Sequence, residues 1–320
     1  MGKPILVGYD PRKTDNASLA FGVAAARFTG TRLIVACVQA RKAPSLPVSG
    51  EPLDYAVGQN DPDLIGDASA AARAVEEHLE NEGIAFEVRL YQSSSAAKAL
   101  QGAVEEEDAG LLVVGSSRRS GLGRVLAGGT AMRLLHGAPC PVTVVPRAWM
   151  REGPPSTIGV AFVNTEEGRE ALRGAHALAR RAKATVRVIT VVKVTAEMFF
   201  ETEPSVSGQT GKSLAEVEGE HRLEAERQAR VAVAELGDDV PVEVEAVIGD
   251  PAEEIVEFSK GVDLLVCGSR GYGPARAVLL GSVSRRVVSE AHCPVIVLPR
   301  GVKASLQALV AEERGAAAPA

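Results

Sequence analysis

Aromatic residues are scarce in this chain of 320 residues: phenylalanine, tyrosine and tryptophan together make up only 4%. Hydrophobic residues nevertheless make up 46%. The core must therefore be built mainly from Val, Ala, Leu and Ile. Such a composition favours a parallel β-sheet covered by alanine-rich helices.

Cysteine and histidine are also few, with four and five residues. Cys37 and Cys267 lie in apolar runs, and Cys140 and Cys293 each precede a proline. None belongs to a Cys-x-x-Cys pair, and no histidine stands at ligand spacing from a Cys, Asp or second His. The pattern predicts reduced, buried thiols and no metal site.

The sequence lacks a long apolar run and any excess of positive charge. No uninterrupted apolar stretch reaches the ~18 residues that indicate a membrane-spanning helix. The N-terminal residues lead directly into an apolar strand, which is unlike a signal peptide. The net charge of −6 argues against a nucleic-acid groove. We therefore expect a cytoplasmic protein that binds neither nucleic acid nor membrane.

A repeat offset of 153 residues organises the chain. The segments 111–130 (LLVVGSSRRSGLGRVLAGGT) and 264–283 (LLVCGSRGYGPARAVLLGSV) align at this offset. The same offset relates the Cys-Pro-Val triplets at 140–142 and 293–295. Self-similarity on this scale indicates a duplicated domain. We predict one domain over 1–147, a linker over 148–155, a second domain over 156–300 and a C-terminal tail over 301–320.

Each half alternates apolar strand-like runs with amphipathic helical runs. In the first half the strands are expected at 5–9, 33–38, 86–90, 111–114 and 142–145. Such alternation favours parallel pairing with right-handed crossovers. The 86–90 run alternates apolar and charged residues and is expected near a sheet edge. In such sheets ligands bind beyond the carboxyl ends of the strands, where Asp10, Val38 and Gly115 lie.

A glycine-rich loop follows the fourth strand of each half. In the second half Gly268, Gly271 and Gly281 precede Ser282 at the start of an amphipathic run. A helix N-terminus presents unpaired N–H groups and a partial positive charge, and glycines let the backbone approach a phosphate closely. The loop is therefore a candidate phosphate site, although a tight strand-to-helix turn is an equal alternative.

Individual side chains leave alternatives open. Asp10 can accept a hydrogen bond from an adenosine group or cap the following turn. Thr130 and Ser282 can bind phosphate or cap their helices. No nucleophile elbow, P-loop lysine or pair of catalytic carboxylates is present, so we assign no catalytic residue.

At these residues the chain resembles the universal stress protein family. The second loop matches that family's pattern Gly-x2-Gly-x9-Gly-Ser/Thr, and the trailing Cys-Pro-Val resembles its last strand. The resemblance covers both halves. It implies two tandem Rossmann-like domains of the adenine nucleotide alpha-hydrolase type, each with a five-stranded parallel sheet and helices on both faces. It also implies an intramolecular pseudo-dimer through the fifth strands, with a homodimer as a further option.

Many members of that family bind ATP, for which Mg²⁺ is a possible companion. The candidate residues that this resemblance implies for ATP are Asp10, Val38, Gly115, Arg118, Gly128, Gly129, Thr130, Val191, Gly268, Gly271, Gly281, Ser282 and Val283.

The two halves depart from the family pattern in different places. In the first half, Arg118 stands where the second loop glycine belongs and Gly129 where the Ser or Thr belongs, with Thr130 one residue later. In the second half the loop is complete, but Val163 replaces the aspartate. Three functions follow: an ATP-binding stress regulator with little or no turnover, a scaffold with vestigial sites, or a weak ATP-hydrolysing or adenylating enzyme. We favour the first.

Overall fold

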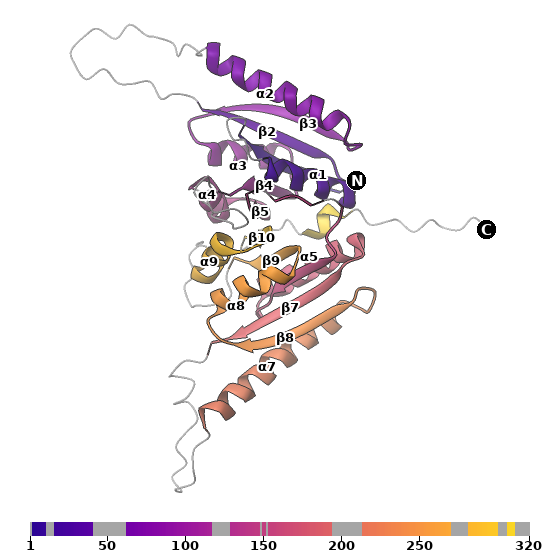
Figure 1. Cartoon of the computed structure of the whole chain (residues 1–320), viewed down its shortest axis with the longest axis vertical. Coiled ribbons are helices and arrows are strands. Elements are labelled where there is room, and N and C mark those ends of the chain that lie inside the picture. Colours follow the sequence, from indigo (N-terminus) through magenta and orange to yellow (C-terminus); the bar gives the residue numbers. More distant parts are fainter. Residues whose placement is uncertain are drawn as a thin grey trace, which may run out of the picture.

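The computed structural model describes residues 2–10, 16–40, 62–116, 129–147, 149–151, 153–193, 213–269, 281–299 and 306–310. Within these ranges ten strands form one sheet of order β3-β2-β1-β4-β5-β10-β9-β6-β7-β8 (Figure 1). The elements of the first half are β1 (Ile5–Tyr9), α1 (Ala17–Thr29), β2 (Leu33–Ala40), α2 (Pro62–Glu80), β3 (Phe86–Ser93), α3 (Ala96–Glu106), β4 (Leu111–Gly115), α4 (Gly129–Gly137) and β5 (Val142–Val145).

The second half repeats this order of strands. Its elements are β6 (Thr157–Ala161), α5 (Glu166–Ala182), β7 (Thr185–Val192), α7 (Leu214–Ala234), β8 (Val242–Ile248), α8 (Pro251–Phe258), η1 (Ser259–Gly261), β9 (Leu264–Gly268), α9 (Ser282–Glu290), β10 (Val295–Leu298) and η2 (Leu306–Leu309). Each half contributes five mutually parallel strands, as the sequence predicts.

Local sequence fixes where several helices begin. Asp250 accepts hydrogen bonds from the backbone N–H groups of Ala252 and Glu253 at the start of α8. Ser213 and Glu216 form a reciprocal capping box at the start of α7. These contacts satisfy backbone donors that the helix itself leaves unpaired.

The two halves meet where β5 runs antiparallel to β10. Ile296 lies opposite Thr143, and Val295 and Val297 lie opposite Val144 and Val142. Thr143 and Ile296 occupy the same position of the repeat, 153 residues apart. An antiparallel pair of equivalent residues lies on a local two-fold axis, so the halves are related by a pseudo-two-fold axis through this pair.

Helices cover the two faces of the sheet as two sets. Apolar residues of α1, α2, α5 and α7 pack on one face, and those of α3, α4, α8 and α9 pack on the other. In Figure 1, α4 and α9 lie on the left of the seam between β5 and β10. Because side chains alternate along each strand, Val7 joins the first core and Leu6 the second.

The edge strands of the sheet are β3 and β8. The alternation of apolar and charged residues at 86–90 correctly predicts that β3 is an edge strand. Arg89 bonds Glu87 along β3 at 2.7 Å, and Arg187 on β7 bonds Glu245 on β8 at 3.2 Å. Charged side chains on edge strands oppose pairing with other chains.

Part of the C-terminal tail packs firmly against the protein. Leu306 and Leu309 of η2 are buried, and the N–H of Lys3 donates to the carbonyl of Ala308 at 2.8 Å. The amphipathic turn at this point of the sequence thus ties the tail to the N-terminus and to α5. All four cysteines are free and buried. None of the helices in the described ranges is long and apolar enough to cross a membrane.

Candidate functional site

A pocket lies at the carboxyl ends of β1, β2 and β4 in the first half. Its volume is about 90 Å³. The residues that line it are Gly8, Tyr9, Asp10, Val38, Ala96, Leu100, Val114, Gly115, Thr130 and Ala131. Four of the candidate residues from the sequence therefore come together here, namely Asp10, Val38, Gly115 and Thr130. This is the switch point of the half-sheet, because β1 pairs with both β2 and β4.

Polar groups of the pocket come from the end of β1. Asp10 follows the strand directly and is half-buried. The hydroxyl of its neighbour Tyr9 hydrogen-bonds to Asn16 Oδ1 at 3.3 Å. Burial raises the pKa of Tyr9, and the nearby Cys37 and Asp10 add to the effect. Tyr9 therefore stays a neutral donor beside the carboxylate.

The start of α4 forms the opposite wall of this pocket. Gly129 and Thr130 are the first two residues of the helix and are both exposed. Thr130 thus lies inside the first turn rather than at the capping position. Backbone N–H groups at this end of a helix favour an anion. Two further candidates from the sequence, Arg118 and Gly128, lie outside the described residues.

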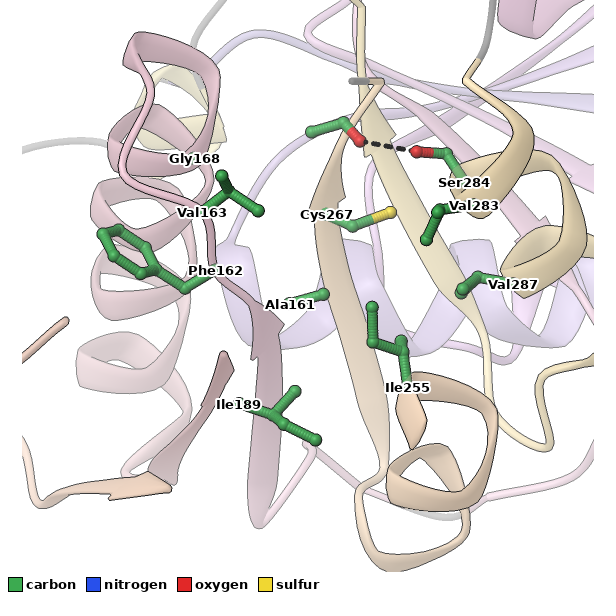
Figure 2. A pocket seen from close by; sticks show the side chains of 11 residues that line it. Ala161, Phe162, Val163, Gly168, Ile189, Ile255, Cys267, Val283, Ser284 and Val287 are labelled. Atoms are coloured by element: carbon green, nitrogen blue, oxygen red, sulfur yellow. Dashed lines mark hydrogen bonds between the residues drawn. The ribbon is translucent and has the colours of Figure 1, made fainter. Parts of the chain in front are cut away.

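The second half has an equivalent pocket of about 30 Å³ (Figure 2). Its lining residues are Ala161, Phe162, Val163, Gly168, Ile189, Ile255, Cys267, Gly268, Val283, Ser284 and Val287. At the offset of 153, Phe162 replaces Tyr9, Val163 replaces Asp10 and Val283 replaces Thr130. The equivalent of the polar first pocket is therefore smaller and lined mainly by apolar side chains.

Ser284 closes one side of the second pocket. Its buried hydroxyl donates to the carbonyl of Gly268 at 3.1 Å and to that of Ser269 at 3.2 Å. Figure 2 shows this hydroxyl turned toward the end of β9. The N–H of Gly281 also donates to the Ser269 carbonyl, at 3.0 Å. These bonds tie the start of α9 to the strand, so the Ser284 hydroxyl serves the fold at this position.

The remaining second-half candidates are spread out. Gly281 is the capping residue of α9 and supplies no side-chain bond, while Ser282 is exposed at the first helical position. Val283 lines the pocket beside Gly268. Val191 is buried in the core and is not among the lining residues. Gly271 lies outside the described residues.

Acidic residues lie close to Arg286 of α9 and to Lys193. Arg286 bonds Asp250 at 3.3 Å and Glu253 at 3.1 Å, and Lys193 lies 3.8 Å from Asp250. The hydrogen bond to Glu253 is the main cause of the raised pKa of Arg286. These paired cations offer little net positive charge to a phosphate.

Sequence reasoning missed several pocket residues. Tyr9 had a usable signal, because it is the last residue of β1 and directly precedes Asp10. Leu100 and Ile255 had none, since they lie on α3 and α8 and reach the pockets only through tertiary packing. In the described ranges, no group of three or more His, Cys, Asp or Glu residues is arranged to hold a metal ion.

Comparison with known proteins agrees with this architecture. A universal stress protein of Mycobacterium tuberculosis is 28% identical over 300 residues, covering 92% of this chain and 99% of the relative. One from Methanocaldococcus jannaschii is 35% identical over 136 residues, covering 42% of this chain and 76% of the relative.

Among solved structures, a putative universal stress protein from Pseudomonas aeruginosa has a TM-score of 0.66 at 19% identity. The match covers 97% of this chain and 98% of that one. The likeness at this identity concerns the fold. The model of the universal stress protein family matches residues 1–146 and again 155–299. The chain therefore belongs to the universal stress protein family, as a tandem member with two copies of its domain.

Proposed function

We propose that this protein binds one adenine nucleotide, ATP, in its first half and acts as a stress or growth-state regulator with little or no turnover. The observation that carries this proposal is the meeting of Asp10, Val38, Gly115 and Thr130 in one pocket. The carboxylate of Asp10 would accept from the adenosine. The N–H groups at the start of α4 would face the phosphates.

The second half would bind ATP weakly or not at all. Its pocket has no carboxylate among its lining residues and is the smaller of the two. A ligand binds less tightly when one of its polar groups is buried without a hydrogen-bond partner. The complete glycine pattern that includes Gly268, Gly281 and Ser282 could still contact phosphates, but it lacks the partner for adenosine.

Mg²⁺, if it takes part, would arrive with the nucleotide. The three phosphates of ATP supply the oxygen ligands that this ion prefers. Because no described residue group forms a ready metal site, the chain's own contribution would be to position the phosphates.

We further propose that the β5–β10 pairing makes the two halves a permanent pseudo-dimer. The domains would span 1–147 and 156–300, with 148–155 as the linker. The pairing consists of backbone hydrogen bonds between buried strands, which disfavours separation in water.

A scaffold whose nucleotide sites are vestigial is the second candidate, and the apolar second pocket favours it for that half. The distinguishing experiment is to denature the freshly purified protein and to identify any released nucleotide by chromatography. The binding proposal expects released adenine nucleotide and a melting temperature that rises with added ATP. An empty protein with a melting temperature insensitive to millimolar ATP would favour the scaffold. Steady ATP hydrolysis above background would favour the enzyme.

A further inference from the structure

The second pocket, at the carboxyl ends of β6 and β9, has walls that are continuous with the apolar core. The side chains of Ile189, Ile255, Cys267 and Val287 are buried, with at most 5% of each residue exposed. Figure 2 shows Ile255, Cys267, Val283 and Val287 facing one another around the pocket. The space that they enclose is therefore a small recess of the core rather than a groove on the surface.

Backbone polar groups that border the second pocket are already paired. The N–H of Phe162 donates to the carbonyl of Ile189 at 2.9 Å, and the carbonyl of Val163 accepts from the N–H of Thr165 at 2.7 Å. The N–H of Gly168 donates to Thr165 Oγ1 at 3.2 Å. These bonds leave the backbone with little capacity to hold a polar ligand in the pocket.

The polar side chains of the pocket wall offer no charge. Ser284 uses its hydroxyl to donate to the carbonyls of Gly268 and Ser269. Among the described lining residues only Cys267 has an ionisable side chain, and burial raises the pKa of its thiol to about 12. A protonated, buried thiol behaves as a small hydrophobic group. A buried water needs about two to four polar partners, so water is a poor occupant of this pocket.

Two differences between the halves give the second pocket its apolar character. Val163 stands where the first half has Asp10, and Val283 where it has Thr130. Valine and threonine have nearly the same shape, so the second difference removes a hydroxyl and keeps the volume. Together the two differences exchange a polar wall for an apolar one at the same place in the fold.

The size of the second pocket limits what can occupy it. Its volume is about 30 Å³. A single buried water needs ~10–15 Å³, whereas an apolar cavity of ~150 Å³ takes up benzene. The second pocket lies between these sizes and has room for only a few atoms. An occupant has to be uncharged, apolar and smaller than benzene.

We propose that the second pocket binds a small apolar molecule of the size of a dissolved gas. Such a molecule gains dispersion contacts with the methyl groups and the thiol of the wall. It displaces little or no bound water, because the wall holds water poorly. The duplicated chain would then carry two sites of different chemistry. This proposal does not depend on ATP binding in the first half.

Xenon is a suitable probe of the second pocket, because it is uncharged, apolar and monatomic. The experiment is a titration of the full chain with dissolved xenon, followed by the NMR signals of isoleucine, leucine and valine methyl groups. Ile189, Ile255 and Val287 report on the pocket. Leu19 and Leu79, buried in the core on the opposite face of the sheet, are the control signals. Benzene is the control ligand for size.

We expect saturable xenon shifts at the three reporter residues, negligible shifts at the two controls and no response to benzene. Val283→Thr, which restores the residue of the first half, should weaken xenon binding about fivefold, because it adds a polar group to the wall. Val231→Thr makes the same chemical change at a 45% exposed position of α7 and should leave binding unchanged. Ala161→Leu, which fills the pocket with hydrocarbon, should abolish binding.

Four outcomes would overturn the proposal. The first is a set of reporter shifts that grow linearly with xenon pressure, as those of the controls do. The second is a nuclear Overhauser effect from water to the reporter methyl groups, and the third is an equal effect of Val283→Thr and Val231→Thr. The fourth is loss of the xenon shifts on addition of ATP, since the two pockets share no residue. The methyl spectrum of each variant without xenon shows whether the protein is folded.

Discussion

Thr143 lies opposite Ile296 across the β5–β10 seam, and the two residues occupy the same position of the duplicated sequence. Thr143 is fully buried, and its hydroxyl has no hydrogen-bond partner among the described residues. The axis that relates the two halves therefore passes beside an unsatisfied polar group. Burial of such a group costs free energy that an apolar side chain of the same shape would not cost.

Thr143→Val should therefore stabilise the protein. Valine keeps the branched shape and removes the unpaired hydroxyl, so we expect the free energy of unfolding to rise by about 1 kcal/mol. Urea unfolding followed by circular dichroism measures this. Thr29→Val is the matched control, since the buried Thr29 hydroxyl donates to the carbonyl of Ala25 at 2.6 Å. That variant should lose stability, and a loss in both would contradict our account of the seam.

A close approach of α1 to β1 makes a second prediction. A Cβ added at Gly22 would lie 2.3 Å from Val7 Cγ2 and 3.1 Å from Leu33 Cδ1. Gly22→Ala should therefore force the helix away from the sheet and lower the free energy of unfolding by ~1–3 kcal/mol. At the exposed Gly102 of α3 an added Cβ meets nothing within 4 Å. There, Gly102→Ala should raise stability by ~0.5–1 kcal/mol. If both substitutions changed the free energy of unfolding by the same amount, helix propensity alone would explain the result and the close contact at Gly22 would not matter.

The left-handed backbone conformation of Lys183, φ 57°, makes a third prediction. A non-glycine residue in this region carries a cost of ~1–2 kcal/mol, which the favourable placement of a cation at the C-terminus of α5 offsets by ~0.3–1 kcal/mol. Lys183→Gly should therefore raise the free energy of unfolding, by up to about 1 kcal/mol. A lower thermal midpoint in low salt would mean that the charge outweighs the strain.

Asp263 anchors the start of the second half and makes stability depend on pH. Burial opposes its ionisation, but hydrogen bonds from Ser156 and Thr157 and the nearby Arg151 outweigh burial and lower the pKa of Asp263. Ser156 donates through its hydroxyl at 2.7 Å, and the backbone N–H of Thr157 at 2.9 Å.

Because the folded pKa of Asp263 is depressed, its contribution is fully present above the unfolded value of about 4 and is lost as pH falls through the folded value. Asp263→Asn should lower the free energy of unfolding at neutral pH. Below pH ~4 the free energies of unfolding of the variant and the unaltered protein should become more similar. Unfolding in urea at pH 7 and at the lowest pH that keeps both proteins folded measures that difference. A difference that stays constant with pH would assign the effect to lost packing instead.

Carboxylate placement makes a prediction about the two nucleotide pockets. Asp10→Ala removes a charged acceptor, so ATP should bind ~10- to 100-fold more weakly. The reverse change, Val163→Asp, puts a carboxylate at the equivalent place in the second half and should create or strengthen binding there. Thermal shifts with ATP compare the two variants directly. If ATP raised the melting temperature of both variants as much as that of the unaltered protein, Asp10 would not be part of the ATP site.

Much of this arrangement could be predicted from the sequence because it is local. Strand ends such as Asp10 and Gly115 follow apolar runs, and parallel pairing gathers them at one edge. The resemblance to the universal stress protein family, rather than the offset of 153 residues, implies that the fifth strands of the two halves pair. By contrast, Leu100 of α3 and Ile255 of α8 reach the two pockets only through tertiary packing. The hydrogen bond from Arg181 Nε to the carbonyl of Phe28 depends on how the halves dock, which no local pattern encodes.

Titration calorimetry with ATP on nucleotide-stripped protein tests the central claim most directly, because it counts sites before it measures affinity. We expect one site per chain in the unaltered protein, and loss of most of the heat in Asp10→Ala. A stoichiometry of one that persists unchanged in Asp10→Ala would contradict the assignment to the first half. Absence of binding heat at several temperatures, or two equal sites, would contradict the proposal of a single ATP site.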